Sequence, residues 1–124
     1  MWIYTPTGFI SAVAKRSNPT QLTVRARDRQ SLDELVALTG EKATIGEGTD
    51  YPYRVVVSRE LFKFWLDRQV DDLAYSNFKD EAHKVRGYEY ASVLGRVWSD
   101  NLALEDQESA QHYFDLSASH KATR

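Results

Sequence analysis

The sequence predicts an α+β fold, in which helices pack on an antiparallel sheet of about four strands. Short extended segments separated by turn residues fill the first thirty residues. A helical pattern and then a β-branched run follow, and residues 59–104 carry apolar residues at helical spacing. The predicted order is three strands, a helix, a strand and three helices. Because the first links are short, the sheet should be antiparallel.

The first thirty residues predict three strands. Residues 2–5 are β-branched or aromatic and precede a turn signal at Pro6-Thr7-Gly8. Residues 9–14 form a second extended run. Residues 22–27 alternate apolar and polar side chains with period two, which is typical of a half-buried strand. The second and third strands should pair through the turn at 16–20.

A short helix over 32–39 is the clearest local prediction. Ser31 and Glu34 have the spacing of a capping box, in which the serine caps the helix start and the glutamate reaches back. Gly40 occupies the position of a left-handed C-terminal cap. The glycine-rich and charged segment 41–52 is predicted to be a loop.

A buried strand is predicted at 53–57, and three helices complete the fold. Ser58 should cap a helix that runs to about residue 74, and Asn77 should cap the next, which ends near Gly87. The last helix should end near residue 104. The residues expected in the core are apolar residues of the predicted helices and of the strand at 53–57. They are Leu35, Val55, Val57, Phe62, Leu66, Val70, Val93, Leu94 and Val97.

Length and composition predict one small domain over residues 1–106. Residues 107–124 lack a sustained periodic spacing of apolar residues and are predicted to form a flexible tail. The absence of cysteine excludes a disulfide scaffold, a thiolate metal site and a cysteine nucleophile. No apolar run approaches the roughly 18–20 residues that span a bilayer, and no secretory signal is visible. We therefore expect a cytoplasmic protein without membrane contact.

Several segments together resemble a family of small bacterial and phage proteins of about 120 residues. They are W-I-Y-T, G-F-I-S-A-V, V-R-A-R, Y-R-V-V-V and D-D-L-A-Y-S-N-F-K. The resemblance covers residues 1 to about 105, and Y-S-N-F-K at 75–79 is its most distinctive part. The family has no known function, so the resemblance implies no activity, cofactor or site residue.

No constellation for catalysis, cofactor binding or metal binding emerges from the residues. Gly46 and Gly48 start a glycine pattern, but a strand follows them where a dinucleotide site needs a helix. Asp67 and Asp71 lie one helical turn apart, yet two carboxylates are too few for a hard cation. His83 should face solvent on a helix. The sequence therefore predicts no enzyme, no cofactor and no metal.

The arginines of the third strand support one functional hypothesis. Arg25, Arg27 and Arg29 lie on one side if the strand reaches residue 29, and Arg54 can join them from the neighbouring strand. Such a face suits nucleic-acid phosphates and stacked bases. Alternatively, the arginine stems cover the sheet and their heads pair with acidic helices. The net charge of −2 favours this second interpretation.

The leading hypothesis is a protein-interaction or regulatory module, either a homodimer or an inhibitor of another macromolecule. The helix over 59–74 carries more apolar surface than a one-sided helix needs. Aromatic and arginine residues often anchor interfaces. The candidate interaction surface combines the residues of both hypotheses: Arg25, Arg27, Arg29, Arg54, Phe64 and Trp65. Nucleic-acid binding through the arginine-bearing sheet face is the alternative.

Overall fold

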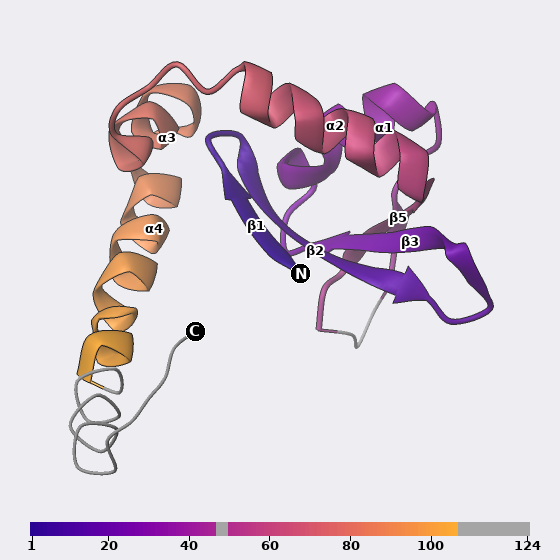
Figure 1. Ribbon diagram of the computed structural model, residues 1–124, viewed down its shortest axis with the longest axis horizontal. Helices are drawn as coiled ribbons and strands as arrows, with labels where there is room; N and C mark the ends of the chain where they lie inside the picture. The colour runs from indigo at the N-terminus through magenta and orange to yellow at the C-terminus, as the bar shows by residue number, and fades with distance from the viewer. Residues whose placement is uncertain (47–49, 107–124) are drawn as a thin grey trace, which may run out of the picture.

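The computed structural model describes residues 1–46 and 50–106, which form a five-stranded antiparallel sheet with helices packed on it. This confirms the predicted α+β class. The strands are β1 (Trp2–Thr5), β2 (Gly8–Lys15), β3 (Asn18–Ala26), β4 (Thr44–Ile45) and β5 (Tyr53–Ser58). The helices are the 3-10 turn η1 (Gln30–Leu32), α1 (Asp33–Thr39), α2 (Arg59–Asp71), α3 (Phe78–Arg86) and α4 (Tyr88–Asp100). The strand order is β1-β2-β3-β5-β4 (Figure 1).

The strand predictions hold, with one omission. β2 and β3 pair as expected through a turn after Lys15. β4 lies within the segment 41–52, which was predicted to be a loop. Its two residues pair with Tyr53 and Arg54 of β5. A strand of this length carries too few residues to show an alternating pattern.

One face of the sheet carries the main core. Alternate residues of β2, β3 and β5 point toward α1 and α2. The buried members of this core are Ile10, Ala12, Leu22, Val24, Ala26, Leu32, Leu35, Val55, Val57, Phe62 and Trp65. Leu35, Val55, Val57 and Phe62 were predicted to be buried, and the structure confirms them.

The start of α1 differs from the predicted capping box. Ser31 lies inside the 3-10 turn η1, and the residue that precedes α1 is Leu32, which makes no side-chain cap. Asp28 takes the capping role instead, since its Oδ1 accepts a hydrogen bond of 3.3 Å from the Ser31 amide. Glu34 points toward α2, where it accepts a hydrogen bond from Trp65. The left-handed cap at Gly40 is confirmed, with φ of 72°.

The buried face of α2 is rotated from the predicted stripe. Phe62 and Trp65 are buried, whereas Leu66 is only half-buried and Val70 is 62% exposed. The reason is that the Trp65 indole packs on Phe62 and donates to Glu34 of α1. That contact turns the aromatic side of the helix toward the core. The cap at Ser58 is confirmed, because its hydroxyl accepts from the Leu61 amide at 3.1 Å.

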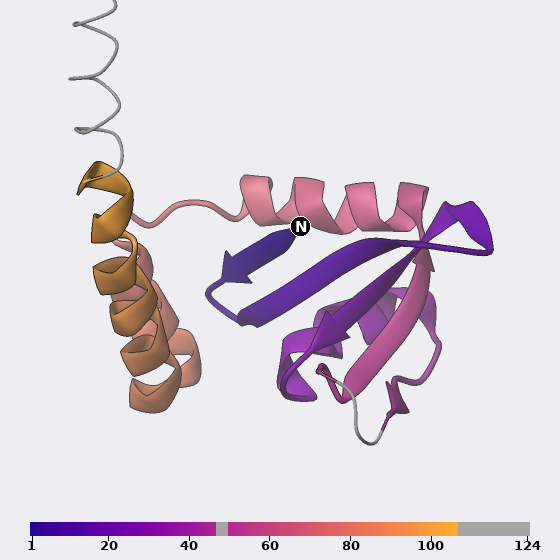
Figure 2. The same ribbon diagram turned by 90° about the horizontal axis from the view of Figure 1, so that it is seen from below.

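α3 and α4 form a hairpin that stands beside the turn between β1 and β2, apart from α1 and α2 (Figures 1 and 2). Tyr90 and Leu94 of α4 are buried with Ala82 of α3 against Tyr4 and Phe9. The predicted core positions Val93 and Val97 are not buried, since Val93 is exposed and Val97 is half-buried. α4 has few neighbours besides α3, so only a narrow stripe is covered.

Polar contacts anchor this hairpin to the sheet. Arg86 of α3 pairs with Asp28 at 2.6 Å and donates to the Thr7 carbonyl and to the Ser31 hydroxyl. The Tyr90 hydroxyl donates to the Thr5 carbonyl at 2.7 Å.

The predicted tail over 107–124 lies outside the described residues, which end at residue 106, where the predicted domain ends. The segment 102–106 is helical after a turn at Asn101. Within the described part of the chain, no helix has the length and apolar character that crossing a membrane requires.

Candidate interaction surface

The predicted arginine face is centred on a buried tyrosine. Arg25 and Arg54 are opposite each other on β3 and β5. The Arg25 guanidinium donates to the Ser11 hydroxyl at 2.8 Å and lies 4.6 Å from the centre of the Tyr51 ring. Arg54 Nε donates to the Tyr51 carbonyl at 3.2 Å. Tyr51 itself is only 4% exposed, so these guanidinium groups help to hold it on the sheet.

Arg27 and Arg29 lie beyond the end of β3, which ends at Ala26. Arg27 also lies over the Tyr51 ring, donates to the Asp50 carbonyl and pairs with the Asp50 carboxylate at 3.8 Å. Arg29 is exposed at the start of η1 and is not part of this group. Among the described residues, none of these arginines forms an ion pair with a helix carboxylate. The expected pairing with acidic helices is therefore wrong, because a loop tyrosine and Asp50 occupy these guanidinium groups.

The two α2 residues of the predicted surface are separated. Phe64 is 53% exposed, and Arg68 lies 6.0 Å from its ring centre. Trp65 is 3% exposed and belongs to the core, so its assignment to an interaction surface is wrong. The cause is again the hydrogen bond from the Trp65 indole to Glu34, at 3.0 Å. The predicted surface residues therefore do not form one patch.

A different group of exposed apolar side chains does gather in one region. Three pockets adjoin β1, and Tyr4 lines all of them. Many of the large apolar side chains that line these pockets are exposed, whereas Tyr4 is half-buried and Leu94 is buried. We call this region the Tyr4 surface and define it by Trp2, Tyr4, Val70, Leu73, Val85, Trp98 and Leu104.

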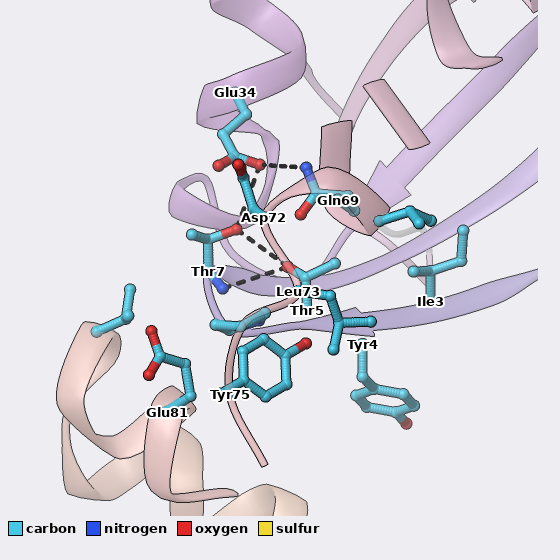
Figure 3. Close-up of a pocket in the computed structure, with 13 residues that line it drawn as sticks. Ile3, Tyr4, Thr5, Thr7, Glu34, Gln69, Asp72, Leu73, Tyr75 and Glu81 are labelled. Carbon is cyan, nitrogen blue, oxygen red and sulfur yellow. Dashed lines mark hydrogen bonds between the residues drawn. The ribbon is translucent and has the colours of Figure 1, made fainter. Parts of the chain in front are cut away.

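The first pocket lies on the α2 side of β1 and has a volume of about 290 Å³. Ile3, Val70 and Leu73 give it aliphatic walls. Three carboxylates also line it: Glu34 of α1, Asp72 at the end of α2 and Glu81 of α3 (Figure 3). Among the described residues, no lysine, arginine or histidine lines it. We call it the acidic pocket.

Two further pockets lie between β1 and α4. One, of about 370 Å³, is lined by Phe78, Leu94 and Trp98, and the Lys79 ammonium lies 4.8 Å from the centre of the Trp98 ring. The other, of about 500 Å³, lies between Trp2 and Leu104. Since Tyr4 and Val97 line both, the two pockets are neighbours. We call them the α4 pockets.

β1 is an edge strand, and within the described part of the chain nothing pairs with its outer backbone groups. Met1 and Ala12 exchange two backbone hydrogen bonds of 2.8 Å, which makes them a hydrogen-bonded pair. Hydrogen-bonded pairs alternate along an antiparallel ladder. The backbone N–H and C=O groups of Ile3 therefore point toward β2, whereas those of Trp2 and Tyr4 point outward. No described residue makes a hydrogen bond to these outward groups.

The part of the chain that the structure describes holds no group of three or more histidines, cysteines and acidic residues arranged for a metal ion. The acidic pocket carries three carboxyl groups at the protein surface. Their electrostatic effect is to favour a cation there.

Sequence reasoning missed the Tyr4 surface for an identifiable reason. Val70 and Leu73 continue the apolar stripe predicted for residues 59–74, and Val70 was predicted to be buried. They lie at the end of α2, where they line the acidic pocket beside the edge of the sheet. The excess apolar surface on 59–74 was the available signal, but it pointed to Phe64 and Trp65. Comparison with family models, with curated proteins and with solved structures found no match to this chain.

Proposed function

We propose that this chain is a protein-interaction module that binds its partner through the Tyr4 surface. The observation that supports this most is the convergence of exposed apolar side chains on three pockets that share Tyr4. Scattered apolar residues are ordinary on a surface, but a contiguous group with polar residues at its rim is typical of an interaction site. Tyrosine and tryptophan, which are frequent interface anchors, contribute three of its seven members.

The contacts of the arginines support this choice over nucleic-acid binding. A phosphate-binding face needs guanidinium groups that are free to contact the backbone of the ligand. Arg25 and Arg54 instead hold Tyr51, and Arg27 is paired with Asp50. Nucleic-acid binding through the arginines is the second hypothesis.

Site-specific photo-crosslinking in the source cell tests the proposal. A photoreactive phenylalanine analogue is placed at Trp98, which is 60% exposed in the Tyr4 surface. The matched control carries it at Phe64, which is 53% exposed but lies outside that surface. We expect a discrete protein adduct from position 98 and none from position 64.

A second copy of this chain is one partner that the experiment can reveal, since its adduct would have twice the mass of the chain. Equal adducts from positions 64 and 98, or no adduct from position 98, would contradict the proposed function.

A further inference from the structure

We infer that the edge of β1 binds an extended segment of another protein as an added antiparallel strand, in which lysine or arginine residues alternate with apolar residues. This inference rests on the proposed function and specifies the partner's chemistry. Added strands bind through backbone hydrogen bonds, and pockets for alternate side chains provide specificity. The β1 edge offers both, because no described residue pairs with its outer backbone groups and pockets flank both of its faces.

The alternation of side chains determines which pocket receives which residue. In an antiparallel pair, residues directly opposite each other point to the same face of the sheet. Partner residues opposite Ile3 and Thr5 would therefore point to the acidic pocket. Residues opposite Trp2 and Tyr4 would point to the α4 pockets. An added strand thus presents two different sets of side chains to two different environments.

The acidic pocket favours long basic side chains. Lysine and arginine can lay their aliphatic stems on apolar walls while their charged heads remain at the rim. Ile3, Val70 and Leu73 provide such walls, and Glu34, Asp72 and Glu81 provide the charge. Thr7, Trp65 and Gln69 all donate their hydrogen bonds to Oε1 of Glu34. No described residue donates a hydrogen bond to the other oxygen, Oε2.

The α4 pockets favour apolar side chains on the other face of the added strand. Trp2, Leu94, Val97, Trp98 and Leu104 line them. A partner segment with basic residues on one face and apolar residues on the other matches both environments.

The same charges disfavour a second copy of this chain as the occupant. Pairing of β1 with another β1 would bring two acidic pockets to one interface. The strand Trp2–Thr5 supplies no basic side chain to neutralise them. Like charges at an interface weaken association, so the partner should be a different and basic segment.

The opposite edge of the sheet lacks these features. β4 has two residues, and both are exposed. Very short edge strands are a common protection against pairing with another chain. β1 is longer, and none of its four residues is proline or charged, which are two other common protections.

Fluorescence anisotropy with short labelled peptides tests the inference on the full chain. The first peptide alternates valine and lysine, and the second carries glutamate in place of each lysine. We expect the lysine peptide to bind and the glutamate peptide to bind at least about tenfold more weakly, because the acidic pocket repels it. Equal binding of the two peptides would overturn the inference.

Backbone methylation separates strand addition from simple charge attraction. In the inferred complex, the valines are opposite Trp2 and Tyr4, so their N–H groups point at β1. Methylation of the valine nitrogens should therefore weaken binding at least about tenfold, because several backbone hydrogen bonds are lost. Methylation of the backbone nitrogens of the lysines should change the affinity less than about threefold. Equal losses from both peptides would overturn the inference.

Variants of the protein locate the binding site. Asp72→Asn with Glu81→Gln removes two charges from the acidic pocket, and Asp67→Asn with Asp71→Asn removes two charges from α2 outside it. We expect the first pair to weaken lysine-peptide binding about three- to tenfold, and the control pair to leave it within about twofold. Equal effects of both pairs would overturn the inference. Thermal unfolding verifies that each variant folds.

The outcomes distinguish this inference from the proposed function. A partner adduct at position 98 without binding of the lysine peptide would retain the proposed function and overturn strand addition. Absence of both the adduct and peptide binding would overturn both.

Discussion

At the scale of single residues, Gly8 and Asp28 connect the sheet to the helices. Gly8 follows the tight turn after β1 and packs against η1. A Cβ atom built on Gly8 would lie 2.7 Å from the Ser31 Cα, which is closer than packed atoms can approach. The Ser31 hydroxyl fills the remaining space, accepts from the Phe9 amide at 3.1 Å and donates to Asp28 at 2.5 Å. Gly8 is therefore required by close approach of two backbones.

Gly8→Ala should lower the free energy of unfolding by about 1–3 kcal/mol, the usual cost of inserting an atom into a packed contact. The clash is with the backbone of Ser31, so side-chain rotation cannot relieve it. Denaturant unfolding monitored by tryptophan fluorescence measures the change. A loss under about 0.5 kcal/mol would mean that η1 does not pack on this turn.

Asp28 should make stability depend on pH. Burial raises the pKa of its carboxyl, but hydrogen bonds from Ser31 and Arg86 and the Arg86 charge outweigh burial and lower that pKa below 3.8. A carboxyl with a lowered folded pKa stabilises the fold above its unfolded pKa. That stabilisation is lost as the pH falls through the folded pKa.

Asp28→Asn should therefore be less stable than wild type near pH 7, with a difference that shrinks below about pH 4. Unfolding free energies measured from neutral to acidic pH give this difference. A difference that is constant over the whole range would show that the Asp28 charge does not contribute.

At the scale of elements, local signals predicted the starts of α2 and α3 and the ends of α1 and α3 correctly. α2 and α4 end at Asp71 and Asp100, before the predicted ends near residues 74 and 104. Ser58 and Asn77 cap α2 and α3 through short contacts within the chain, at 3.1 and 2.9 Å. Such caps depend on residues three positions apart, so the sequence alone contains them. The capping box at Ser31 failed because its two side chains bond to other partners. Glu34 binds α2, and Ser31 bonds to Asp28, Phe9 and Arg86.

The rotated face of α2 predicts a contrast between two positions on that helix. Phe62→Ala should cost about 3–5 kcal/mol, as expected for a truncated core aromatic residue. Val70→Ala should change stability by less than about 0.5 kcal/mol, because Val70 is 62% exposed. Chemical denaturation of both variants makes the comparison. A large loss at Val70 would restore the stripe that the sequence predicted.

At the scale of the whole molecule, the two sheet faces have different roles. The face toward α1 and α2 holds the core, while the opposite face holds Tyr51 among arginines. The alternation of Leu22, Val24 and Ala26 with polar residues predicted this division correctly. It could not predict the occupant, since Tyr51 lies in a distant loop whose position depends on the fold. For the same reason, the convergence of β1, α2 and α4 on the Tyr4 surface was not predictable from periodicity.

The arginines predict different effects for two neighbouring substitutions. Arg25→Ala should destabilise the fold by about 1–3 kcal/mol, because it removes the Ser11 hydrogen bond and the packing on Tyr51. Arg27→Ala should cost less than about 1 kcal/mol, since its side chain is 60% exposed and its ion pair is on the surface.

Thermal unfolding and heparin elution are measured on both arginine variants and on wild type. If nucleic-acid binding is the function, both substitutions should lower the salt concentration of elution. We expect wild type to elute at low salt and neither substitution to change it. Strong, salt-sensitive retention that is lost in both variants would contradict the proposed function.

Amide hydrogen exchange along β1 reports on the backbone groups that an added strand would use. Exchange is measured residue by residue, with and without the peptide of alternating valine and lysine. We expect the Trp2 and Tyr4 amides to become protected on binding, while the Ile3 amide, already paired with β2, changes little. Unchanged exchange at Trp2 and Tyr4 with saturating bound peptide would contradict strand addition at β1.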